Sequence, residues 1–198
     1  MRSLKDCIVE SLLDDEDKVF DGAKEGVVKE FLKENYNIQG SYTIKETKTM
    51  FIVDVKGDIE VANEGITSLT NGLFEFGEVS RNFDCSYCDS LKTLEGAPKE
   101  VGRDFACPFC DSLKTLEGAP KEVGKGFYCN YCKSLKTLEG APQKVRGNFN
   151  CEYCKSLKTL EGAPEKVGEN FNCRGCGIKF STEDVKKYTK VSGLILVV

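Results

Sequence analysis

Apolar residues recur along this chain at a fixed step of 22 positions. The nonapeptide SLKTLEGAP occurs four times without change, beginning at Ser90, Ser112, Ser134 and Ser156. Phenylalanine and valine keep the same step, at Phe83, Phe105, Phe127, Phe149 and Phe171 and at Val101, Val123, Val145 and Val167. One unit therefore has the pattern FxCxxCxSLKTLEGAPxxVGxx, and a repeat of this length indicates a stack of similar supersecondary units.

Each unit can bury its apolar residues only by packing on its neighbours, which predicts a solenoid with one continuous core. The alternation of Phe105 and Cys107 favours a short strand with both side chains inward. Gly102 and Gly124 suit a tight corner before such strands. Too few residues follow each Leu-Glu-Gly-Ala-Pro for a full helix, so turns and extended chain are expected on the convex side. The predicted fold class is α/β, a solenoid of parallel strands with little helix.

The pattern continues in weaker form ahead of the cysteines. Val61, Ile66, Leu69 and Val79 stand 22 residues before Phe83, Cys88, Leu91 and Val101. Residues 58–81 are therefore expected to form a degenerate first coil, and residues 58–176 the whole solenoid.

Residues 1–57 carry a different periodicity and predict a small acidic α+β unit. Helical spacing joins Leu4, Cys7, Ile8 and Leu12, and again Val27, Val28, Phe31 and Leu32. Alternation typical of strands joins Tyr42 with Ile44, Phe51 with Val53 and Val55, and Ile59 with Val61.

Residues 177–198 are expected to cap the far end of the stack, because terminal coils otherwise expose apolar faces. Ser181 or Thr182, followed by Glu183 and Asp184, is typical of a helix start, and the helix is expected to run through residues 185–190. A last strand is predicted within Leu194 to Val198.

Charge is divided unevenly along the chain. The net charge is −4, but residues 1–80 carry 9 Lys and Arg against 17 Asp and Glu, whereas residues 81–198 carry 19 against 15. No apolar run is long enough to span a membrane, and the first ten residues lack the apolar stretch of a signal peptide. We therefore expect a cytoplasmic protein with no membrane partner.

The chain contains no histidine, which removes the commonest proton shuttle and the commonest metal ligand. It also lacks a phosphate-binding glycine loop and a nucleophile elbow, and its carboxylates are spread along the repeat. We therefore expect neither an enzyme nor a cofactor.

Ten of the eleven cysteines form CxxC pairs, at Cys85/Cys88, Cys107/Cys110, Cys129/Cys132, Cys151/Cys154 and Cys173/Cys176. Such pairs often bind zinc, and a zinc-binding protein is one alternative. Tetrahedral zinc, however, needs four ligands from two knuckles, whereas stacked coils place the first and second cysteines in two separate columns. We predict that these cysteines are small apolar core residues, that there is no metal site, and that Cys7 is also a core residue.

The repeat resembles the leucine-rich repeat, because Phe105-x-Cys107-x-x-Cys110-x-x-Leu113-x-x-Leu116 parallels LxLxxCxxLxxL. Cys110 takes the position of the asparagine or cysteine ladder, while phenylalanine replaces the first strand leucine and the convex segment is short. The repeat is more closely similar to the SLxxLEGAPxxVGxxFxC repeats of many phage-encoded proteins. This resemblance implies a solenoid that binds a host protein, such as a defence or regulatory enzyme, in the host cytoplasm.

Residues between the inward-facing positions form columns along the strand side, and we predict the partner-binding site there. One column is aromatic, and aromatic residues are enriched at binding hot spots, although the same rings also suit a stacked ladder. The candidate residues are Tyr87, Phe109, Tyr131 and Tyr153 in that column, and Asp84, Tyr128, Asn150, Asn130, Glu152 and Arg174 beside it.

Two further columns change sign along the stack, namely Asp89, Asp111, Lys133, Lys155 and Glu100, Glu122, Lys144, Lys166. The leading hypothesis is a protein-interaction module whose partner is a host enzyme or its nucleic-acid complex. The alternatives are direct nucleic-acid binding, and mimicry of a nucleic acid by the acidic first unit toward a nucleic-acid enzyme.

Overall fold

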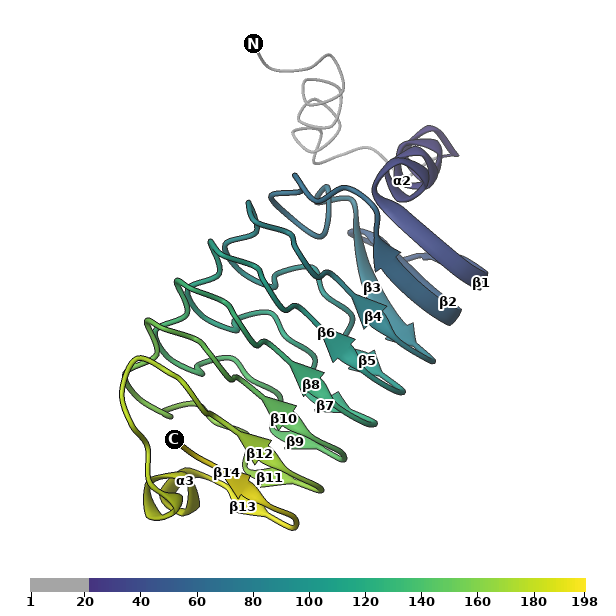
Figure 1. The fold of residues 1–198 in the computed structure, drawn as a ribbon. Coiled ribbons are helices and arrows are strands. Elements are labelled where there is room, and N and C mark those ends of the chain that lie inside the picture. The colour runs from purple at the N-terminus through teal and green to yellow at the C-terminus, as the bar shows by residue number, and fades with distance from the viewer. Residues whose placement is uncertain (1–21) are drawn as a thin grey trace.

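The computed structural model describes residues 22–198, most of which wind into a parallel β-solenoid (Figure 1). Each regular coil contributes two short strands, one ending in the repeated valine and one beginning with the repeated phenylalanine. The valine strands are β3 (Phe74–Val79), β5 (Glu100–Val101), β7 (Glu122–Val123), β9 (Lys144–Val145), β11 (Lys166–Val167) and β13 (Lys190–Val191). The phenylalanine strands and their continuation are β4 (Phe83–Asp84), β6 (Phe105–Ala106), β8 (Phe127–Tyr128), β10 (Phe149–Asn150), β12 (Phe171–Asn172) and β14 (Ile195–Leu196).

Both sets of strands stack in parallel, and equivalent residues of successive repeats are register partners. Phe105 pairs with Phe83 and Phe127, and Val123 pairs with Val101 and Val145. The predicted solenoid with a 22-residue period is therefore confirmed. In Figure 1 the two strands of each coil lie on either side of its tip.

One long strand, β2 (Phe51–Val61), begins both stacks, because its first half pairs with β3 and its second half with β4. The expected register of the first coil was wrong at this point. Phe83 pairs with Ile59 instead of Val61, and the β2–β3 register shifts between Val53 and Val55. The two extra residues between Ile59 and Phe83 are absorbed in the irregular chain of the first coil.

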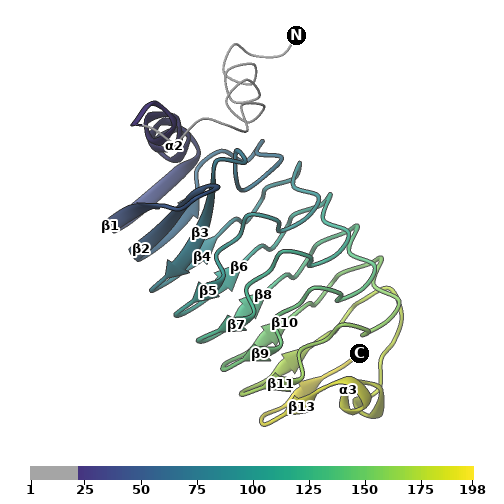
Figure 2. The ribbon, with the colours of Figure 1, turned by 180° about the vertical axis from the view of Figure 1, so that it is seen from behind.

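The amino-terminal edge is covered by α2 (Gly22–Asn35) and β1 (Tyr36–Glu46), as Figures 1 and 2 show. Both the helix and the strands expected here are confirmed, and β1 pairs with β2 along its whole length, antiparallel. Val28 and Leu32 of the helix are buried, and the Tyr36 hydroxyl donates to the Leu69 carbonyl oxygen at 2.6 Å. The helix predicted around Leu4 to Leu12 lies outside the described residues.

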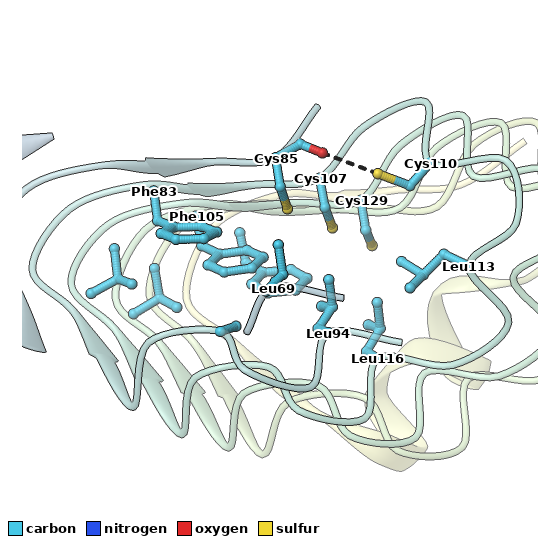
Figure 3. Close-up of a cluster of buried hydrophobic side chains, with 14 of the residues drawn as sticks. Leu69, Phe83, Cys85, Leu94, Phe105, Cys107, Cys110, Leu113, Leu116 and Cys129 are labelled. Atoms are coloured by element: carbon cyan, nitrogen blue, oxygen red, sulfur yellow. Dashed lines mark hydrogen bonds between the residues drawn. The ribbon is translucent and has the colours of Figure 1, made fainter. Parts of the chain in front are cut away.

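Inside the stack, identical side chains lie over one another (Figure 3). The phenylalanine rings of successive coils are parallel, with centroids 5.1 Å apart between Phe105 and Phe127. From the second CxxC pair onward, the second cysteine of a coil donates its S–H to the carbonyl oxygen of the first cysteine one coil earlier, as Cys110 does to Cys85 at 3.2 Å. The same bond recurs at Cys132, Cys154 and Cys176. These thiols thus satisfy backbone carbonyls that face the core.

A second set of bonds, made by side chains, holds the corners between the two strands of most coils and is interrupted at Gly126. Asn82 Oδ1 accepts from the Asp104 backbone N–H at 3.1 Å, and Asp104 Oδ1 accepts from the Gly126 N–H at 2.8 Å. Asn148 and Asn170 continue this pattern toward the carboxyl end. Short amide and carboxylate side chains therefore stabilise the corners, where the strand ladder is interrupted.

The carboxyl-terminal cap is α3 (Thr182–Tyr188) together with β13 and β14. Ser181 is the N-cap and forms a reciprocal capping box with Asp184, as the sequence predicts. The helix is shorter than expected, because Thr189 is its C-cap and Lys190 already pairs with Lys166 in the valine-strand stack.

Candidate protein-binding face

The aromatic column forms a stacked ladder at the CxxC turns. The ring centroids of Tyr87, Phe109, Tyr131 and Tyr153 are separated successively by 4.9, 4.7 and 4.9 Å. The two end members are the most exposed, at 54% for Tyr87 and 40% for Tyr153. The inner two are half-buried because their faces are covered by neighbouring rings.

Every ladder residue has a left-handed backbone, with φ between 56° and 62°. This conformation costs an L-residue roughly 1–2 kcal/mol and is an outlier for a bulky side chain. Gly175 occupies the fifth position with the same conformation, φ 63°, and a Cβ there would lie 2.6 Å from Tyr153 Cδ1. The ladder therefore ends where the Tyr153 ring lies over a glycine.

The polar residues ahead of the ladder have defined local roles. Asp84 Oδ1 accepts from the backbone N–H of Ser86 at 2.8 Å, and Asn150 Oδ1 accepts from that of Glu152 at 3.0 Å. In the second coil the same positions hold Ala106, which cannot accept, and Pro108, which has no N–H to donate. Part of this predicted site therefore shapes the chain between the strand and the CxxC turn.

At the carboxyl end, the predicted residues join in a polar network. Glu152 accepts from Asn150 Nδ2 at 3.4 Å and from Asn172 Nδ2 at 2.8 Å. Arg174 donates from Nε to Asn172 Oδ1 at 3.3 Å and remains exposed. Asn172 is thus the shared partner, although the sequence analysis did not select it.

Tyr128 is directed toward the corner of its coil. Its hydroxyl oxygen would lie 2.4 Å from a Cβ at Gly126, so the ring lies over that glycine. Partial burial and the negative charge of Asp104 raise the pKa of Tyr128. Asn130 is half-buried. The predicted site therefore divides into a ladder with its polar flank and a tyrosine near the corner.

The column that follows the CxxC pairs, on the other flank of the ladder, changes sign from Asp89 and Asp111 to Lys133 and Lys155. The contacts of these residues were not predicted from the sequence. Lys155 Nζ lies 5.2 Å from the centroid of the Tyr153 ring and donates to the Gly175 carbonyl oxygen at 2.8 Å. One coil earlier, Lys133 forms an ion pair with Asp111 at 2.6 Å. A cation is attracted to an aromatic face, so Lys155 stabilises the last ring of the ladder.

The cysteines contribute to the core beneath this face. Burial raises the pKa of the Cys88 and Cys173 thiols to about 12. The Cys107 pKa is also raised well above its ordinary value, first by its contact with Cys132 and then by burial. These three thiols are therefore protonated near neutral pH. Among residues 22–198, no group of three or more Cys, Asp or Glu side chains is arranged to hold a metal ion.

The face offers ring edges, phenol hydroxyls, amides, the carboxylates of Asp84 and Glu152, and the exposed Arg174 guanidinium. Within the described part of the chain, no helix is long and apolar enough to cross a membrane. Comparison with known proteins finds no matching family model, no matching curated protein and no matching solved structure.

Proposed function

We propose that this protein is a binding scaffold whose aromatic ladder, with the polar residues beside it, docks on the surface of another protein. The observation that carries the proposal is the stack of four rings, exposed at Tyr87 and Tyr153, that is held in a left-handed backbone conformation. Glycine would fit this backbone better, as it does at Gly175. A large ring at a position that favours glycine points to a use for the ring, although part of its cost is offset by stacking.

The flanking charges favour a partner with an extended contact region. Asp84, Asp89 and Asp111 lie beside the early rings, while the late rings have three cations beside them, Lys133, Lys155 and Arg174, and one carboxylate, Glu152. A partner surface with the opposite order of charges is therefore steered to one orientation along the ladder. The ladder supplies rigid contact area with little loss of side-chain entropy.

Nucleic-acid binding is less well supported by this geometry. Bases bind single-strand proteins by stacking on the faces of aromatic rings. Here the inner faces of the ladder are occupied by neighbouring rings, and the last ring faces Gly175 and Lys155. Edges and hydroxyls remain accessible, and these suit a protein surface better than a base.

The resemblance to repeats of phage-encoded proteins makes the proposal more specific. On that basis the partner belongs to a bacterial host, and binding inhibits a defence or regulatory enzyme. The acidic first unit provides an alternative contact in which it imitates a nucleic acid toward the same kind of enzyme.

Affinity capture from bacterial lysate tests the role of the ladder. The test variant is Tyr87→Gly/Tyr131→Gly/Tyr153→Gly, because glycine keeps the local backbone. The control is Tyr42→Ala/Tyr188→Ala, which removes two tyrosines that are exposed elsewhere. We expect one protein to be retained by the wild type and by the control but lost by the ladder variant. Equal retention by all three proteins contradicts the proposal, and nuclease-sensitive capture of nucleic acid alone favours the alternative.

A further inference from the structure

A row of six charged side chains runs along the valine strands, on the far side of the corner from the ladder. Its members are register partners in adjacent strands, so each lies directly beside the next. In order along the solenoid the row is Glu78, Glu100, Glu122, Lys144, Lys166 and Lys190. Three carboxylates are thus followed by three amines, with the sign changing at the centre.

Within one copy, this order brings like charges together. Neighbouring parallel strands are about 4.8 Å apart, and like charges directly opposite each other across strands are destabilising. Opposite charges meet only where the sign changes, since Glu122 Oε2 lies 3.5 Å from Lys144 Nζ and 3.6 Å from an Arg146 guanidinium nitrogen. A single copy therefore leaves the outer charges of the row without an opposite neighbour in the row.

A groove lies beside the acidic half of the row. Its volume is about 330 Å³, and it is lined by the three glutamates together with Gly102 and Gly124. Arg146 is the next lining residue and occupies, one coil later, the position of Gly124. The groove beside Gly124 thus lies on the acidic side of the boundary between Glu122 and Lys144, and the long cationic side chain of Arg146 lies on the basic side.

We propose that two copies of this protein associate through the row in an antiparallel, two-fold symmetric arrangement. The two-fold axis lies in the plane of contact, between β7 and β9, and runs parallel to these strands. Rotation about this axis places each carboxylate of one copy opposite an amine of the other. The facing pairs are Glu78 with Lys190, Glu100 with Lys166, and Glu122 with Lys144, each occurring twice. An isologous contact of this kind requires a self-complementary surface, and a row of three acids and three bases is one.

Neighbouring positions are complementary under the same rotation. The rotation brings Arg146 of one copy to Gly124 of the other, so that the long side chain enters the hollow beside Glu122. It also brings exposed Arg103 opposite exposed Glu169 of the second copy. The contact is built mainly from exposed charges, so its affinity is modest and depends on salt.

Charge reversal provides the test, with sedimentation velocity on the full chain over a range of concentrations. The measurements use about 0.01 M salt, where the Debye length is about 30 Å, and about 1 M salt, where it is about 3 Å. We expect a reversible dimer at low salt that dissociates at high salt. Either Glu100→Lys or Lys166→Glu should weaken it about ten-fold or more, because each creates two repulsive pairs.

Mixing the two single variants is the decisive step. In a mixed dimer, the substituted position of the Glu100→Lys copy faces the substituted position of the Lys166→Glu copy, and their charges are opposite. The unchanged Lys166 of the first copy faces the unchanged Glu100 of the second. Dimerisation should therefore return to the wild-type level. Matched controls are Glu117→Lys and Lys136→Glu, which make the same charge changes at exposed positions outside the row. A wild type that stays monomeric at low salt overturns the proposal. The proposal is also overturned if the row variants dimerise as strongly as the wild type, or if the mixture dimerises no more strongly than each variant alone.

Discussion

Substitution of Tyr131 by alanine and by glycine separates the two properties of the aromatic ladder, stacking and backbone conformation. The Tyr131 ring stacks on Phe109 and on Tyr153, at centroid distances of 4.7 and 4.9 Å. Each stacked pair contributes about 0.5–1.5 kcal/mol beyond its area, so either substitution removes about 1–3 kcal/mol of stacking. The difference between the two variants then reports on the backbone alone.

Tyr131 has φ 62°, which disfavours alanine by about 1–2 kcal/mol relative to glycine. Glycine gains more freedom in the unfolded chain, which reduces this advantage by about 0.4–1 kcal/mol. We therefore expect the glycine variant to be more stable than the alanine variant by about 0.8 kcal/mol, the middle of the range that these two effects leave. At an ordinary strand position the order is reversed, because glycine there is less stable than alanine.

The assay is equilibrium unfolding in urea, followed by far-ultraviolet circular dichroism. The matched control is the same pair of substitutions at Tyr42, an exposed residue within β1. There the alanine variant should be the more stable one. If alanine also equals or exceeds glycine at Tyr131, the left-handed conformation of the ladder is refuted.

Three further predictions concern the core, pH and the cap. Phe127 is fully buried between two parallel rings, so Phe127→Ala should lower the free energy of unfolding by about 3–5 kcal/mol. Guanidinium titration measures this change, and a loss below about 1 kcal/mol would contradict the packing. Burial raises the pKa of Cys88 and Cys173 from 9.0 to about 12. Above pH 9 these thiols ionise in the unfolded chain but stay protonated in the folded one, so their contribution to stability is full below pH 9 and declines toward pH 12. The variant Cys88→Ala/Cys173→Ala should show a smaller decline over that interval. Ser181→Ala breaks the box with Asp184 and should cost about 1 kcal/mol, seen as faster amide exchange in α3 with unchanged exchange in β8.

The solenoid could be predicted because repetition multiplies a weak local signal. A single Phe-x-Cys segment is ambiguous, but the same spacing at Phe83, Phe105 and Phe127 leaves only an arrangement in which equivalent residues stack. The same step also identified the candidate face, since it separates the inward positions from those between them. The cap at Ser181 was predictable from local chemistry alone.

Features that depend on irregular chain were not predictable in this way. The register of the first coil was wrong because two extra residues separate Ile59 from Phe83, and a fixed 22-residue step has no means of placing them. The corner ladder was missed because its positions hold asparagine or aspartate in four coils but glycine in one, at Gly126, so no single residue type marks them. The left-handed backbone at Tyr87 was also missed, since an aromatic residue gives no sequence signal for positive φ.

The interior position of the cysteine pairs is the central claim, and thiol accessibility tests it most directly. Cys7→Ser removes the one cysteine outside the described residues and leaves ten in the chain. In native protein we expect a maleimide to modify at most Cys176, which is half-buried, whereas all ten thiols react in guanidinium. Metal analysis of the same sample should show no zinc. Rapid modification of several cysteines in the folded protein, or one bound zinc per chain, would contradict the account.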